Sequence, residues 1–134
     1  MRALAFIALL LSACDTMNIQ QYRIAGGAHR DTAKVKHILH TVAGETGLVD
    51  STRTSRAPRT IVFYTQPNVQ HFRLDHGARA VADDIVIDLN AGFGPTPPEF
   101  QKAERVLTPA LSSEFGSRLT IAPPGVQSAP VTTQ

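Results

Sequence analysis

The chain has 134 residues, of which 43% are hydrophobic and 18% charged, with one cysteine and no tryptophan. This composition is typical of one small globular domain. A single cysteine excludes an intrachain disulfide and a zinc site built on paired thiolates. Thirteen Lys and Arg against eleven Asp and Glu give a formal charge of +2. The positive charges are spread along the chain rather than gathered in a run, so we expect no nucleic-acid partner.

The N-terminus reads as a secretory signal peptide. Arg2 is followed by an apolar run over residues 3–11 and by two small residues. The run is too short to span a bilayer, which needs about 20 apolar residues. Leu11-Ser12-Ala13-Cys14 resembles the lipobox of bacterial lipoproteins. This resemblance covers only the first 14 residues and implies cleavage before Cys14 and a diacylglyceryl thioether on its thiol. An ordinary cleaved signal peptide is the alternative.

The resemblance divides the chain and gives it a location. We expect a signal peptide at residues 1–13, lipidated Cys14 with a tether to residue 19, one domain at 20–123 and a disordered tail at 124–134. Two or three acyl chains would hold the protein stably on the periplasmic side of a cell membrane. Asp15 resembles the signal that keeps enterobacterial lipoproteins in the inner membrane. Other bacteria sort differently, so the inner membrane is favoured and the outer stays open.

The first half of the domain changes from strand to helix periodicity. Alternation over residues 20–25 predicts a short strand with Tyr22 and Ile24 on one face. Helical spacing then predicts an amphipathic helix at 31–43, with an apolar stripe of Val35, Ile38, Leu39, Val42 and Ala43. We expect Asp31 or Thr32 to accept hydrogen bonds from its first-turn amides. Gly44 or Gly47 is expected to end it.

The middle of the chain predicts an antiparallel meander. Residues 50–58 are polar and aperiodic, which indicates a loop. Strands are expected at 59–66, at 71–75 with a break at His76-Gly77 and resumption as far as Val81, and at 84–90. In the last strand we expect Ile85, Ile87 and Leu89 inward, with Val86 and Asp88 outward. This alternation predicts a sheet covered on one side only.

The last third predicts a Gly/Pro loop at 91–97, a helix and a short strand at 118–121. The helix begins near Pro98, and Pro109 predicts a kink or two segments. Its apolar face is Phe100, Ala103, Leu107, Ala110 and Leu111. The whole order predicts an α+β two-layer sandwich, with a mainly antiparallel sheet of about four or five strands and two helices on one face. It resembles the ferredoxin-like β-α-β-β-α-β arrangement.

Two sets of side chains are candidates for metal or acid-base chemistry. His37 and His40 share a helix, and His71, Asp75 and His76 lie close together in sequence, so each set is a candidate set of metal ligands. The alternatives are a solvated helix face and a turn. The carboxylates are Asp83, Asp84, Asp88, Glu99 and Glu104, which also suit turns and an exposed helix face. No nucleophile motif is present and the single cysteine belongs to the lipid anchor, so we expect neither an enzyme nor a cofactor.

Two surface features are candidate partner contacts. Phe93 lies between Gly92 and Gly94, so it either faces a partner or folds back over the core. Arg53 and Arg56, with Arg59 nearby, form the densest positive patch, suited to lipid headgroups or an acidic partner, or simply to solvent. We expect a membrane-anchored lipoprotein that docks an envelope partner as a non-enzymatic interaction or assembly module. A lipoprotein that binds a small ligand or a metal is the alternative.

Overall fold

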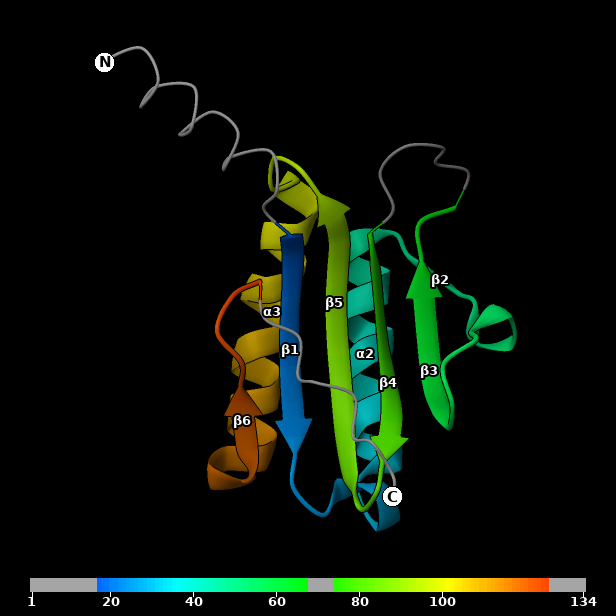
Figure 1. Cartoon of the computed structure of the whole chain (residues 1–134), viewed down its shortest axis with the longest axis vertical. Coiled ribbons are helices and arrows are strands. Elements are labelled where there is room, and N and C mark those ends of the chain that lie inside the picture. Colours follow the sequence, from blue (N-terminus) through cyan, green and yellow to red (C-terminus); the bar gives the residue numbers. More distant parts are fainter. Residues whose placement is uncertain (1–16, 68–73, 126–134) are drawn as a thin grey trace, which may run out of the picture.

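The computed structural model describes residues 17–67 and 74–125, which form a sheet and two long helices in two layers (Figure 1). The strands are β1 (Met17–Ile24), β2 (Val49–Asp50), β3 (Thr60–Thr65), β4 (Asp75–Val81), β5 (Asp84–Phe93) and β6 (Leu119–Ile121). The helices are α2 (Thr32–Thr46) and α3 (Pro98–Phe115), with short 3-10 turns η1 (Gly27–His29), η2 (Thr52–Thr54) and η3 (Gly116–Arg118). The expected α+β class is confirmed.

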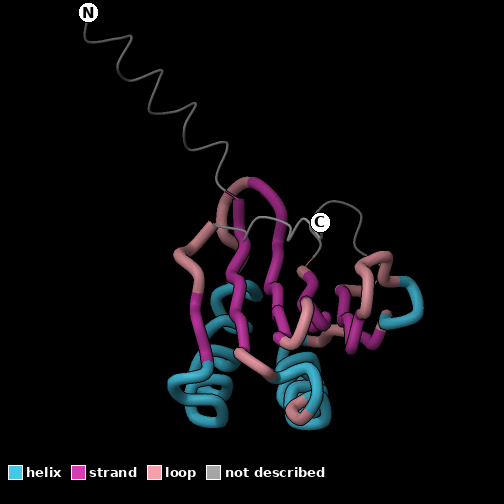
Figure 2. Tube along the Cα trace, turned by 60° about the horizontal axis from the view of Figure 1, so that its bottom comes forward, coloured by secondary structure: helices cyan, strands magenta, loops and turns pink. Residues whose placement is uncertain are grey.

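All strand neighbours in the sheet are antiparallel, in the order β2-β3-β4-β5-β1-β6. Strand β5 lies between β1 and β4, which is the expected split arrangement. Both long helices cover the same face of the sheet (Figure 2). The sheet has six strands, more than expected, because Val49 and Asp50 pair with Thr65 and Tyr64. The expected loop at 50–58 therefore starts inside a short edge strand.

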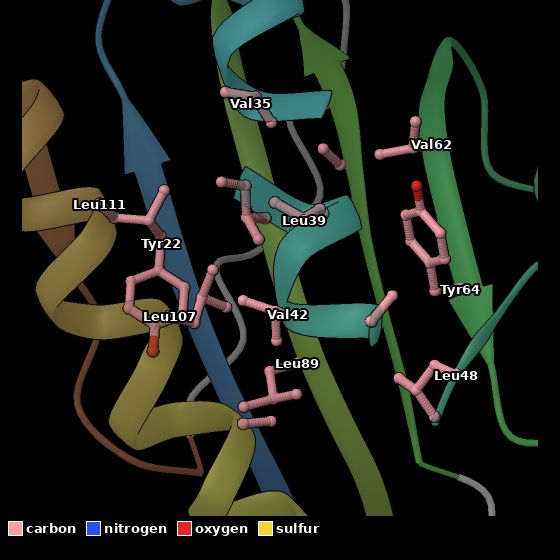
Figure 3. Close-up of a cluster of buried hydrophobic side chains, with 14 of the residues drawn as sticks. Tyr22, Val35, Leu39, Val42, Leu48, Val62, Tyr64, Leu89, Leu107 and Leu111 are labelled. Carbon is pink, nitrogen blue, oxygen red and sulfur yellow. The ribbon is translucent and has the colours of Figure 1, made fainter. Parts of the chain in front are cut away.

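The core lies between the sheet and the two helices (Figure 3). The predicted inward residues of β5 are completely buried, as are Tyr22 and Ile24 of β1. They pack against apolar residues of both helices, among them Val35, Leu39, Val42, Leu107 and Leu111. Helix α3 is continuous through Pro109, so the expectation of two segments is wrong. The Tyr22 hydroxyl lies 2.6 Å from Thr108 Oγ1 beside that proline, and burial raises the pKa of Tyr22 to about 12.

Strand β4 corrects the expected break at His76-Gly77, because both residues lie inside the strand. The glycine has a packing role there. It pairs with Phe63 of β3, and a Cβ at position 77 would lie 2.9 Å from Phe63 Cδ2. Residues 68–73, which include His71, lie outside the described residues. Strand β1 also starts earlier than expected, at Met17 rather than at residue 20, which shortens the tether.

The start of α2 is held by an ion pair rather than by a cap. Asp31 is the N-cap residue, but its side chain makes no hydrogen bond to the first-turn amides, contrary to expectation. The carboxylate, 4% exposed, pairs with Arg118 Nη2. Arg118 Nη2 also donates to the carbonyl of Ala25 at 3.0 Å. The arginine thus ties β1 to α2, and the helix ends at Gly47, whose φ is 70°.

The sheet face away from the helices is mainly polar, but it holds two buried apolar side chains, Ile19 and Val86. Val86 points outward as expected, yet it is only 1% exposed. In register it lies between Arg23 of β1 and Arg79 of β4, whose aliphatic stems can cover it. The carboxylates beside it are paired: Asp84 with Arg23 Nε at 2.7 Å, and Asp88 with Arg79 and with Gln21 Nε2 at 2.6 Å. This network closes the centre of the open face.

Candidate functional site

Phe93 projects from the end of β5 and is 66% exposed. It does not fold back over the core. The glycines on each side have positive φ angles, 70° at Gly92 and 113° at Gly94, which few other residues adopt. Phe93 pairs in register with Met17, so it lies at the end of the sheet where β1 begins and β5 ends. Figure 1 shows the start of β1 beside the end of β5.

The loop that carries Phe93 is held in place by Asn18. This side chain is 5% exposed, and its Nδ2 donates to the carbonyl of Gly94 at 2.9 Å. Its Oδ1 accepts from Thr96 Oγ1 at 2.8 Å. The amide of Gly92 donates to Asn90 Oδ1 at 2.9 Å. The sequence analysis did not identify Asn18, because its partners are more than seventy residues away in sequence.

A second feature is an open groove of about 930 Å³ between α2 and the segment from β2 to β3. Its lining includes Lys36, His37, His40, Asp50, Arg53 and Tyr64. Lys36 and Arg53 form no ion pair with any carboxylate in the described ranges. The lining therefore carries two cations, Lys36 and Arg53, against one carboxylate, Asp50, which interacts electrostatically with Arg53.

The single carboxylate of the groove is held by the turn that follows it. Asp50 Oδ1 accepts from Thr52 Oγ1 at 2.5 Å and from the Thr52 amide at 2.9 Å. These hydrogen bonds lower the pKa of Asp50. Tyr64 is 5% exposed, and burial raises the pKa of its phenol, whose oxygen lies 3.4 Å from His40 Nδ1. The groove thus has a mostly buried aromatic side chain beneath a charged rim.

The structure separates the predicted partner contacts. Arg53 lies in η2 and Arg56 in the loop after it, and both are exposed. Strands β3 and β4 lie between this edge and β5, which carries Phe93. Arg59 donates from Nη1 to the carbonyl of Ala82 at 3.3 Å. Arg53 and Phe93 therefore belong to two surfaces, and only Arg53 contributes to the groove.

The predicted metal candidates do not converge. Across residues 17–67 and 74–125, no three His, Cys, Asp or Glu side chains gather as a metal site. His37 and His40 both line the groove, whereas Asp75 and His76 point to opposite faces of β4. Asp83 lies 3.0 Å from His29, and Asp84 and Asp88 pair with arginines. Asp84 and Asp88 thus link neighbouring strands, whereas Asp83 and His29 form an exposed surface pair.

His76 is a buried residue that the sequence analysis assigned to a turn. Its side chain is 0% exposed, and its ring centroid lies 5.1 Å from that of Tyr64. Neither ring nitrogen has a hydrogen-bond partner within the described part of the chain. Desolvation lowers the pKa of His76 to about 4, so the ring is neutral at pH 7.

Comparisons with known proteins add no relative: no family model, no curated protein and no solved structure matches this chain. The lipobox and Cys14 lie outside the described residues. Within the described ranges, neither long helix combines the length and apolar character that crossing a membrane requires. The groove and the Phe93 loop are therefore the two features on which a function can be argued.

Proposed function

We propose that this chain is a small bacterial envelope lipoprotein, anchored by lipid on Cys14, that acts as a non-enzymatic interaction module. In this proposal the groove beside α2 binds an acidic segment of an envelope partner. The observation that carries it is the positive rim, where Lys36 and Arg53 have no ion pair with a described carboxylate. The membrane anchor rests on the lipobox alone.

The chemistry of the groove suits a protein partner. Exposed cations that are not neutralised attract and orient an acidic surface. Arg and Tyr are the residue types that most often dominate binding energy at interfaces, and here Arg53 and Tyr64 line one groove. Asp50 accepts two hydrogen bonds from Thr52, which favour its ionised form, so the lining holds two cations against one carboxylate.

A small anionic ligand is the second candidate for the same groove. Its volume of about 930 Å³ falls within the range of small-molecule sites, roughly 300 to 1,000 Å³. In contrast to a docking module, such a protein would gain thermal stability from its ligand without any partner present.

Charge reversal combined with in-cell crosslinking tests the groove. We expect one dominant partner to copurify with the wild type and to be lost in Arg53→Glu. Arg105→Glu is the matched control, because Arg105 is exposed on α3 and lies outside the groove. If the wild type captures no partner but is stabilised by small anions, the ligand hypothesis replaces this one. Retention of the partner by Arg53→Glu would show that the groove is not the docking site.

The anchor is tested separately with Cys14→Ala. We expect this variant to keep its first 13 residues and to incorporate no labelled fatty acid, since the modified thiol is gone. Intact-mass measurement distinguishes the precursor from the mature chain. A variant that is cleaved normally and still carries label would refute lipidation at this cysteine, independently of the groove result.

A further inference from the structure

The loop that carries Phe93 has the composition of a lipid-contacting segment. Residues 91–98 read AGFGPTPP and contain no charged side chain. Three of the eight are prolines, which have no amide hydrogen to desolvate. The Gly92 amide is already bonded to Asn90 Oδ1. Moving this loop into lipid therefore desolvates few polar groups. The exposed Phe93 ring is removed from water at the same time, which is favourable.

The same end of the sheet carries a second exposed apolar residue, Val49, at 46%. Register places it there, because Val49 pairs with Thr65, Thr65 with Asp75, and Asp75 with Asn90 near the end of β5. Phe93 and Val49 are two of the three large hydrophobic residues exposed in the described ranges. The carboxylates at this end, Asp50 and Asp75, favour a neutral lipid surface over an anionic one.

Chain length brings this end to the membrane. Two residues separate Cys14 from Met17, so the Cα atoms of Cys14 and Met17 are at most about 11 Å apart. Met17 pairs with Phe93, and paired Cα atoms lie about 5 Å apart. The other end of β5, ten residues long, is about 30 Å further away. A lipid on Cys14 would leave only the Phe93 end within reach of the bilayer.

The loop is also ordered before it meets lipid. Asn18 bonds to both sides of it, at the Gly94 carbonyl and at Thr96 Oγ1. Because these bonds already hold the loop, insertion of the ring pays little conformational entropy. Asn18 follows Met17 directly, so the anchored strand and the Phe93 loop are one rigid unit.

We infer that the Phe93 loop, residues 91–98, contacts the membrane, and we call it the foot. It places the Phe93 ring in the interfacial layer of the bilayer in which the Cys14 lipid is embedded. The inference rests on the proposed anchor and adds a second, non-covalent contact with lipid. The partner is the neutral lipid surface itself rather than a protein. The foot fixes the orientation of the domain on the membrane, which a lipid anchor alone would not do.

A single tryptophan tests the foot, because the chain has none of its own. The lipidated full-length Phe93→Trp protein is reconstituted into phosphatidylcholine vesicles, with and without brominated lipid. The control is Ile121→Trp: Ile121 is 45% exposed on β6 and pairs with Tyr22, about 17 Å along β1 from Met17. Unchanged melting temperatures show that both variants fold.

We expect brominated lipid to quench the tryptophan fluorescence of Phe93→Trp. Iodide in the buffer should leave that fluorescence unquenched. The Ile121→Trp control should behave in the opposite way. If the protein floats with the vesicles but iodide quenches both tryptophans equally, the anchor stands and the foot is refuted. If the wild type does not float and lacks the mass of the lipid, the anchor itself fails and the foot fails with it.

Discussion

His76 gives the sharpest prediction about stability. The ring is fully buried, and both its nitrogens lack a hydrogen-bond partner in the described part of the chain. Desolvation lowers the pKa of His76 from 6.5 to about 4. The fold therefore favours the neutral ring over the charged ring. Acidification should therefore lower the free energy of unfolding through this residue.

The magnitude follows from proton linkage. As pH falls below 6.5 the unfolded chain binds a proton at His76, whereas the folded chain does not until about pH 4. The contribution to stability is complete above pH 6.5 and is lost progressively between pH 6.5 and pH 4. A shift of about 2.5 units corresponds to about 3 kcal/mol over the whole window. At pH 4.5 the loss is about 2.5 kcal/mol.

Urea unfolding, followed by circular dichroism at pH 7 and pH 4.5, measures this loss. His76→Leu keeps an apolar side chain of similar size and removes the titrating ring. We expect the variant to be at least as stable as the wild type at pH 7, because two unsatisfied polar atoms are removed. At pH 4.5 its advantage should grow by about 2.5 kcal/mol. His37→Leu, at an exposed position, is the control and should follow the wild type.

The comparison between variants isolates His76 from the carboxylates. Hydrogen bonds lower the pKa of Asp50 and Asp84, so their contributions are present above their unfolded pKa and are lost only at more acidic pH. They are common to the wild type and both variants. Equal pH dependence in the wild type and His76→Leu would refute the reasoning, since it would mean that water or a polar partner reaches the ring.

Three further substitutions test the packing and electrostatics of the fold by the same unfolding assay at pH 7. Gly77→Ala should destabilise by about 1 kcal/mol, because the new Cβ meets the Phe63 ring; an unchanged free energy of unfolding would contradict this packing. Ala82→Gly should stabilise by about 1 kcal/mol and raise the melting temperature by about 4 °C, because Ala82 has a φ of 52°; a lower melting temperature would argue against strain there. Arg118→Met should cost about 2 kcal/mol by leaving the buried Asp31 carboxylate without its main partner, and Asp31→Asn in the same background should recover part of it.

The fold class was predictable because hydrophobic periodicity is a local signal. Alternation identified the inward residues of β5, and helical spacing identified the buried stripe of α2. The wrong predictions concern residues whose conformation depends on a partner in a neighbouring strand. In the sequence, Gly77 is typical of a turn. In the structure it lies in β4, where the Phe63 ring leaves no space for a larger side chain. The two-residue strand β2 has no periodicity of its own and exists only because β3 offers an edge.

The candidate sites were predictable only as single residues. Arg53 was identified because it lies in a polar loop, and Phe93 because it lies between two glycines. The groove combines residues of α2, η2 and β3, and no local sequence pattern connects these elements. Asn18 was missed because its role depends on Gly94 and Thr96, which follow it by more than seventy residues in sequence. His76 was missed because burial of a polar ring is a property of the packed core, not of its neighbours in sequence.

The two proposals together predict an orientation. A lipid on Cys14 and a foot at Phe93 act at the same end of β1 and β5, so the strands would stand roughly along the membrane normal. The groove lies on the β2-β3 side of the sheet, two strands away from β5, and would face sideways along the membrane surface. If the proposed lipid anchor holds Cys14, a tether of at most about 11 Å would not let the domain reach across the periplasm. The acidic partner should therefore belong to the same membrane, and crosslinks from Arg53 should recover a protein of that membrane rather than one of the opposite membrane.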